Sequence, residues 1–187
     1  MNRQVFDYPA PDRFVAGTVG QPGERIFFLQ ARQGPSLTSV ALEKSQAAML
    51  AERIDQLLDE ARGRGHHDII PEAGLVSYGD TAPLDVPIVE EFRVGAMALG
   101  WDEAKLRVVV EAHGVTEEPA PIPEIGDDAS AGPDTLRVWL EPADARAFAA
   151  RTRTVVAAGR APCPFCSQPL DPEGHLCPRS NGYRRRA

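Results

Sequence analysis

The sequence predicts an α+β fold built from two tandem βββα halves, in which two helices pack on an antiparallel sheet. Three observations lead to this prediction. Runs of β-branched and aromatic residues are separated by turn residues, two longer segments carry apolar residues at helical spacing, and the same order of elements occurs twice. Each half has a sheet face and a helical stripe to bury, so we expect the halves to share one core.

The first half begins with two predicted strands, residues 13–20 and 25–31, joined by Gln21-Pro22-Gly23-Glu24. Because Pro followed by Gly is typical of a type II turn, these strands are predicted to form a hairpin. Residues 37–42 place Thr, Val and Leu on one face and form a third predicted strand. A helix over residues 43–61 follows and ends before two glycines, which act as stop signals.

The second half is predicted to repeat this order. Residues 88–99 and 105–113 are strand candidates, and residues 136–140 carry alternating apolar side chains on a short third strand. Pro142 opens the second helix, since proline is favoured in the first helical turn. Gly159 closes that helix.

A shift of 98 positions superimposes the first strand–helix unit on the second. It places Val40 on Val138, and Leu42-Glu43 on Leu140-Glu141. Any two strand–helix units share an apolar pattern for physical reasons alone. The matching order of four elements nevertheless favours a true internal duplication.

The first strands of the two halves also share the pattern Phe-x-x-Gly, at Phe14 to Gly17 and at Phe92 to Gly95. The predicted domains are a duplicated body, residues 1–159, with halves at about 1–65 and 86–159, and a C-terminal tail, residues 160–187.

Composition is that of an ordinary globular protein. The chain has 187 residues, 43% of them hydrophobic and 25% charged. No apolar run approaches the roughly 18–20 residues that span a bilayer, which excludes a membrane protein. The first residues lack the apolar core of a signal peptide, so a cytoplasmic location is expected.

Charge is unevenly spread along the chain. The 20 Lys and Arg residues against 27 Asp and Glu give a net charge of -7. The tail, residues 160–187, has five Arg against Asp171 and Glu173, so the body is more acidic than the whole. An acidic body excludes general nucleic-acid binding by that part of the chain and leaves only the tail for it.

All three cysteines fall in the tail. Cys163 and Cys166 form a Cys-x-x-Cys turn that lets two thiolates reach one ion, and His175 and Cys177 follow after eight intervening residues. Three thiolates and one imidazole form a zinc set of tetrahedral number. The segment has too little apolar mass to order itself, so coordination would supply its stability, about 10–16 kcal/mol in small zinc peptides. The sequence therefore predicts one structural Zn²⁺.

Two other interpretations of this cluster remain open. A redox Cys-x-x-Cys would suit Cys163 and Cys166, although this motif follows a predicted helix instead of opening one. A catalytic zinc would require one of the four side chains not to be a ligand.

No group of residues combines a nucleophile, a base and an orienting group. The leading hypothesis is therefore a non-enzymatic binding or scaffold protein for an unknown protein or small-molecule partner. A second hypothesis is an enzyme whose site lies between the halves. A third is nucleic-acid binding through the zinc element and the Arg-rich tail, and this predicts affinity that falls steeply with salt. The enzyme site would use Arg13, Arg25, Glu90 and Arg93. The nucleic-acid site would use Arg179 and Arg184 to Arg186.

Several long motifs resemble an actinobacterial family known as domain of unknown function 3090. They include Arg13-Phe-Val-Ala-Gly-Thr-Val-Gly20, Glu90-Glu-Phe-Arg-Val-Gly95, Gly159-Arg-Ala-Pro-Cys-Pro-Phe-Cys166 and Gly174-His-Leu-Cys-Pro-Arg-Ser-Asn-Gly-Tyr183. The resemblance implies an actinobacterial origin. The family's Cys-Pro-x-Cys and Gly-His-x-Cys-Pro patterns map onto the four predicted zinc ligands, and the resemblance implies no activity.

Overall fold

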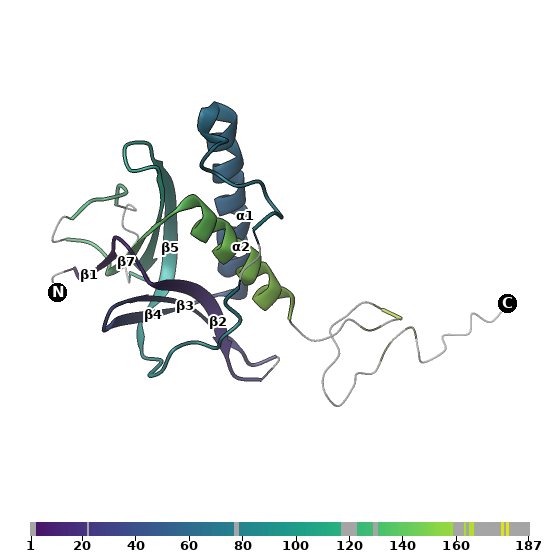
Figure 1. Cartoon of the computed structure of the whole chain (residues 1–187). Coiled ribbons are helices and arrows are strands. Elements are labelled where there is room, and N and C mark those ends of the chain that lie inside the picture. The colour runs from purple at the N-terminus through teal and green to yellow at the C-terminus, as the bar shows by residue number, and fades with distance from the viewer. Residues whose placement is uncertain are drawn as a thin grey trace.

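The computed structural model describes residues 3–21, 23–76, 79–116, 123–128 and 131–158, and positions 163, 165–166, 177 and 179 of the tail. These residues form a seven-stranded sheet, two α-helices and a short π-helix (Figure 1). The predicted α+β class is confirmed. Within the described ranges, neither helix combines the length and the apolar character that crossing a membrane requires.

The first half follows the prediction closely. Strands β2 (Arg13–Val19), β3 (Ile26–Gln33) and β4 (Ser36–Leu42) pair antiparallel. Helix α1 (Lys44–Ala61) comes next and continues into the π-helical turn η1 (Arg62–His66). Alternating and helical apolar periodicity is strong in these segments, which explains why their boundaries are readable to within about two residues.

A β-turn and a helix cap define the ends of these elements. In the β2–β3 turn, the Glu24 N–H donates to the Gln21 carbonyl at 2.9 Å, and Gly23 adopts a φ of 107°. That left-handed conformation favours glycine, in keeping with the predicted turn. At the start of α1, the side chain of Gln46 accepts from the N–H of Glu43 and the Glu43 side chain caps the first turn, which forms a capping box.

The second half contains β5 (Glu90–Asp102), β6 (Arg107–Gly114), β7 (Thr135–Leu140) and α2 (Pro142–Ala157). Its strands also pair antiparallel in sequence order. Strand β5 runs three residues past its predicted end, because pairing continues as far as Asp102.

One strand, β1 (Val5–Tyr8), was not predicted. It pairs parallel with β7, so the order across the sheet is β1-β7-β6-β5-β4-β3-β2. The two halves meet at β4 and β5, which are also parallel. The sheet is therefore mixed, and the prediction of an antiparallel sheet is wrong at these two pairings, because pairing between distant strands has no local signal. Strand β1 therefore lies beside the third strand of the second half, just as β5 lies beside the third strand of the first.

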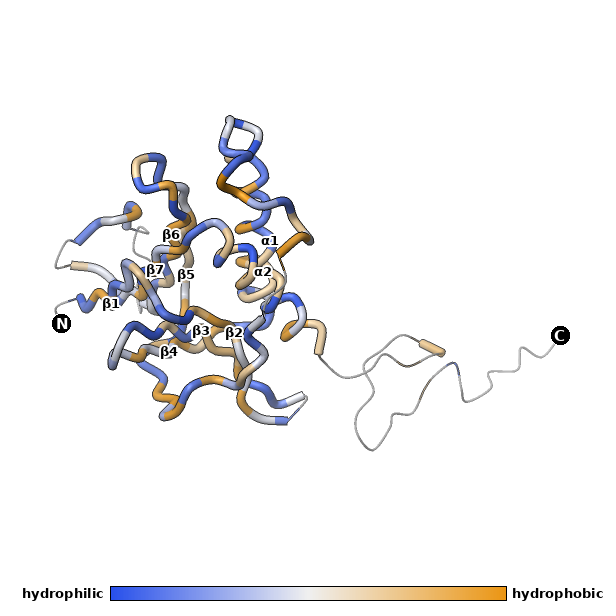
Figure 2. Tube along the Cα trace, in the orientation of Figure 1, coloured by the Kyte–Doolittle hydropathy of each residue, from blue (hydrophilic) through white to orange (hydrophobic). Residues whose placement is uncertain are grey.

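Both helices pack on one face of the sheet and against each other. They enclose a single large core that draws residues from both halves, as the sequence predicts; its largest members include Leu29, Ile54, Leu58, Leu136 and Phe148. Figure 2 shows apolar residues gathered along β2, β3 and β4, while the far ends of α1 and of the β5–β6 hairpin are mainly polar.

The opposite face of the first half is covered by residues 79–89. Leu84 from this segment packs with Val15, Phe28 and Ala41 in a smaller apolar cluster. Nearby, the buried Gln30 amide donates to the Asp85 carbonyl at 3.0 Å and its carbonyl accepts the Asp85 N–H at 2.7 Å. The segment that connects the halves thus packs on the second face of the sheet and forms part of the folded body.

Strand register relates the two halves in detail. Gln30 on β3 lies opposite Ser39 on β4, and Glu111 on β6 lies opposite Arg137 on β7. Ser39 and Arg137 are 98 positions apart, the shift found in the sequence. The helices keep the same offset, since α1 begins at Lys44 and α2 at Pro142. The element order βββα is present twice; a duplication as its origin stays a prediction.

When this register is extended to the first strand of each half, Gly17 and Gly100 hold equivalent positions. Both glycines receive an apolar side chain from a covering loop: a Cβ at Gly17 would lie 2.6 Å from Leu84, and one at Gly100 would lie 2.9 Å from Ile125. The shared pattern Phe-x-x-Gly aligns Gly17 with Gly95, whereas the pairing register aligns Gly17 with Gly100.

Replacing Gly17 with Ala should lower the free energy of unfolding by about 1–3 kcal/mol, because the new Cβ would overlap Leu84 Cγ and Cδ2. Gly100→Ala should cost less, since it meets only the terminal Cδ1 of Ile125. Denaturant unfolding measures both. Gly63→Ala is the control, with nothing within 4 Å of the new atom. A Gly17→Ala protein as stable as this control would contradict the packing described.

Candidate metal centre

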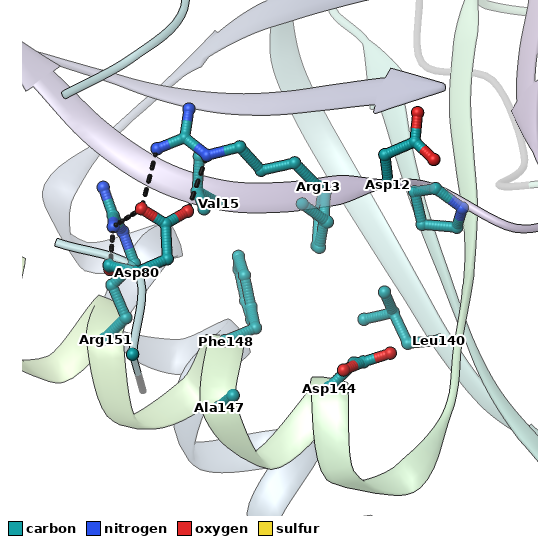
Figure 3. A pocket seen from close by; sticks show the side chains of 12 residues that line it. Asp12, Arg13, Val15, Asp80, Leu140, Asp144, Ala147, Phe148 and Arg151 are labelled. Carbon is teal, nitrogen blue, oxygen red and sulfur yellow. Dashed lines mark hydrogen bonds and ion pairs between the residues drawn. The ribbon is translucent and has the colours of Figure 1, made fainter. Parts of the chain in front are cut away.

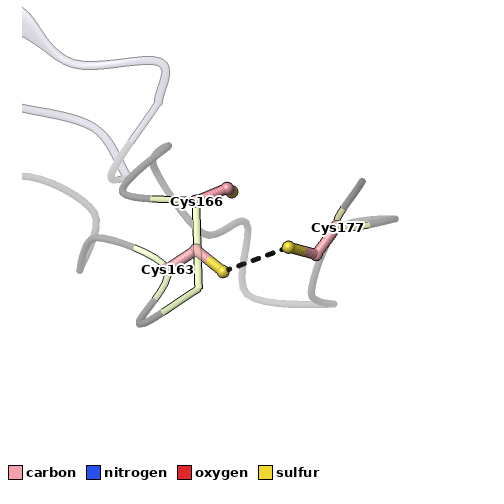
Figure 4. Close-up of side chains that lie close together, drawn as sticks. All are labelled: Cys163, Cys166 and Cys177. Carbon is pink, nitrogen blue, oxygen red and sulfur yellow. Dashed lines mark hydrogen bonds between the residues drawn. The ribbon is translucent and has the colours of Figure 1, made fainter. Parts of the chain in front are cut away.

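The three cysteines of the tail come together in space. Cys163 and Cys166 belong to one turn beyond α2, and Cys177 approaches from fourteen residues further along the chain (Figure 4). Their Sγ atoms all lie within 4.8 Å of one another, and the Sγ atoms of Cys163 and Cys177 are 3.8 Å apart. This is the only such group of His, Cys, Asp and Glu side chains within the described part of the chain.

All three are free thiols, and their spacing is well beyond the roughly 2.05 Å of a disulfide bond. Cys163 and Cys177 are buried, and Cys166 is half-buried. Three sulfur atoms at this distance offer one ligand atom each to a common ion, and thiolates favour soft or borderline metals such as zinc. The donor set therefore fits a metal ion.

The pKa of the Cys163 thiol lies below its ordinary value. Burial alone would raise this pKa. Hydrogen bonds to Cys163 from the backbone of Phe165 and Cys166 and from the Cys166 side chain favour the thiolate, and they more than offset burial and the opposing hydrogen bond with Cys177. Since the thiolate is the form that ligates metals, the turn prepares Cys163 for coordination.

The predicted fourth ligand, His175, lies outside the described residues. Its assignment rests on the sequence, where it precedes Cys177 by two positions. A structural zinc site needs four ligands, and the three described thiols lie close enough together to hold one metal ion.

Family comparison gives a second line of information on the chain. Residues 6–177 match the family described as protein of unknown function (DUF3090). The chain belongs to this family. The match runs from β1 to Cys177, so it takes in both halves of the body and all four predicted ligands, and it confirms the resemblance inferred from the motifs. No match was found among curated proteins or among solved structures.

The residues predicted for an enzyme site between the halves do not converge. Arg13 lines a small pocket between β2 and α2. Arg25, in contrast, donates to the Ala158 carbonyl, and Arg93 pairs with Glu43 and with Glu90 at 3.4 and 3.8 Å. Arg93 and Glu90 therefore lie together, but neither they nor Arg25 line the pocket beside Arg13.

A buried polar cluster on the outer face of the second half was missed. The Glu111 side chain is fully buried, and Arg137 donates to it at 2.5 Å while also reaching the Asp128 carboxylate at 2.7 Å. His113 lies beside them, with Nδ1 3.0 Å from Thr135 Oγ1 and Nε2 3.5 Å from Glu111 Oε2. Alternation along β6 and β7 could have placed these side chains on one face, but nothing local indicates that residues 123–128 cover that face.

Stability should fall as pH drops below the ordinary His pKa of about 6.5. Burial lowers the pKa of His113, and so do the charges of Arg3 and Arg137, although Glu111 opposes them. The folded state therefore holds the neutral ring, and the unfolded chain binds a proton first as pH falls. Urea unfolding between about pH 7.5 and 5.5 should show a smaller loss for His113→Gln than for the wild type. Equal losses would contradict this assignment.

Proposed function

We propose that this protein binds one structural Zn²⁺ through Cys163, Cys166, His175 and Cys177, and that the ion orders the C-terminal tail beside a non-enzymatic body. The approach of the three Sγ atoms to within 4.8 Å carries the proposal. Four protein ligands would leave no position for water or substrate, which favours a structural role over a catalytic one.

The three thiols also bear on the redox alternative. A redox pair would need only Cys163 and Cys166, whereas Cys177 is as close to Cys163 as a metal site requires and is itself buried. A third thiol in the same cluster favours coordination over thiol–disulfide exchange.

Native mass spectrometry of the full chain, purified without chelator, tests the proposal. We expect one zinc ion per chain and reduced cysteines, and loss of the ion on treatment with a strong chelator. A metal-free chain, or one with a disulfide between two of the three cysteines, would overturn it.

The body is proposed to be a tandem duplication of a βββα unit, residues 1–159, that presents a binding surface to an unknown protein or small molecule. The constant offset of 98 between Ser39 and Arg137 and between the starts of the helices supports the duplication. Gly17 and Gly100 hold equivalent positions in the two halves, and each lies against an apolar side chain from a covering loop. This similarity supports the duplication independently.

Nucleic-acid binding by the tail is a second candidate, favoured by one observation. Phe165, at the tip of the Cys-x-x-Cys turn, is 59% exposed, and Arg179 donates to its carbonyl. An exposed aromatic ring beside an arginine can stack on a base. Retardation of single-stranded RNA at low salt, weakened by Phe165→Ala, would support this function, and no retardation would dispose of it.

A further inference from the structure

A small pocket lies between the halves, with β2 of the first half on one side and α2 of the second on the other (Figure 3). Its volume is about 190 Å³. The rings of Phe14 and Phe148 stack at its base with centroids 4.5 Å apart, and Leu140 and Ala147 extend the apolar lining.

One end of the pocket is closed by a charge network in which both described arginines, Arg13 and Arg151, are paired. Arg13 donates to Asp80 at 2.6 and 3.2 Å, and Arg151 donates to the same carboxylate at 3.1 Å. Both arginines also donate to the Ala82 carbonyl, at 3.0 and 2.6 Å. Because these guanidinium groups are committed to residues 80–85, this end does not offer a positive charge to an anionic ligand.

The other end carries two carboxylates, Asp12 and Asp144, which Figure 3 shows on the side away from Asp80. Asp12 accepts the Gly34 N–H at 2.7 Å. Asp144 has no hydrogen-bond or ion-pair partner among the described residues. The unpaired charge of the pocket is therefore negative.

The surroundings of Asp144 would favour a cation paired with its carboxylate. The side chain of Asp144 is exposed at the mouth of the pocket. Desolvation raises the pKa of this carboxyl and the nearby charge of Glu141 adds to the effect, while the charge of Arg107 opposes both. Arg107, the nearby cation, donates to the Pro9 carbonyl and to Glu141 instead. A cation placed beside Asp144 would relieve this unfavourable environment.

We propose that this pocket binds a small organic ammonium ion, with the charged nitrogen at Asp144 and an apolar body over Phe14 and Phe148. The volume limits the guest, because a cavity of about 150 Å³ accommodates benzene. A body of about one phenyl ring therefore fits, and a nucleotide does not. This site is independent of the metal centre.

Titration of the full-length protein with phenethylammonium, followed by NMR, tests the site. We expect binding with a dissociation constant on the order of 1 mM, as is reasonable for so few non-hydrogen atoms. Two probes with the same ring separate charge from apolar contact: phenylacetate carries the opposite charge, and 2-phenylethanol carries none. Both should bind several-fold more weakly.

Two variants locate the binding. Asp144→Asn should weaken phenethylammonium binding by about three- to fivefold, the range of a partly exposed ion pair, whereas Asp68→Asn, at a carboxylate 88% exposed and far along the chain, should not. Ala147→Leu should abolish binding by filling the pocket, and Ala143→Leu, an exposed position on the same helix outside the pocket, is its control. Absence of binding, equal binding of phenylacetate, or no effect of either pocket variant in a folded protein would overturn the proposal.

Discussion

Replacing Cys163 with Ser should remove the metal from the protein. Cys163 is the buried sulfur whose surroundings favour the thiolate, and a serine hydroxyl does not ionise to replace it. The binding free energy that coordination contributes to small zinc elements, about 10–16 kcal/mol, would then be lost to the tail. Elemental analysis should give zinc well below one ion per chain.

The same substitution should leave the body intact. None of the three cysteines belongs to the core that the helices and sheet enclose. We therefore expect unchanged circular dichroism and unfolding of the body, together with faster proteolysis after Gly159. Ser167→Ala, in the same segment but without a thiolate, is the matched control. A Cys163→Ser protein that keeps its metal, or that unfolds as a whole, would contradict the separation of body and tail.

Replacing Arg137 with Met should be the most destabilising single change in the body. It would leave the carboxylate of Glu111, which is fully buried, without its closest cation. Removing one partner of a buried ion pair costs about 3–5 kcal/mol, because the remaining charge is uncompensated. Denaturant unfolding near neutral pH measures this cost.

Two further variants make this prediction specific. Arg153→Met is the matched control, because the Arg153 side chain is 49% exposed and pairs with Asp55 at the surface; we expect a loss below about 1 kcal/mol. The double variant Glu111→Met/Arg137→Met should recover much of the stability, since apolar replacement of both partners is often close to neutral. A single Arg137→Met variant no less stable than Arg153→Met would refute the role given to this pair.

The regular elements could be predicted because their signal is local. Apolar residues recur every two positions along β4 and every three to four along α1, so eight of the observed helices and strands agree in type and nearly in length with the prediction. Strand β1 was not predicted because four residues at a sheet edge give almost no periodic pattern. Its position depends on pairing with β7, more than 120 residues away.

The candidate site likewise has features that the local sequence predicts and features that depend on distant residues. The approach of Cys163, Cys166 and Cys177 follows from ligand spacing, which is a local property of the chain. The cluster of Glu111, His113 and Arg137 does not, since alternating polar residues on a strand indicate a solvated face until a distant loop covers them. Pairing register likewise decides which residues of the two halves are compared, and it aligns Gly17 with Gly100 where the shared sequence pattern aligns it with Gly95.

X-ray absorption at the zinc edge, on full-length protein purified without added metal, tests the proposed coordination of the ion. We predict a first shell of three sulfur atoms at about 2.3 Å and one nitrogen atom at about 2.0 Å. That shell would identify the Cys163, Cys166 and Cys177 thiolates with an imidazole, and His175→Ala should remove the nitrogen. A protein without bound zinc, or a zinc ion coordinated only by nitrogen and oxygen, would contradict the account.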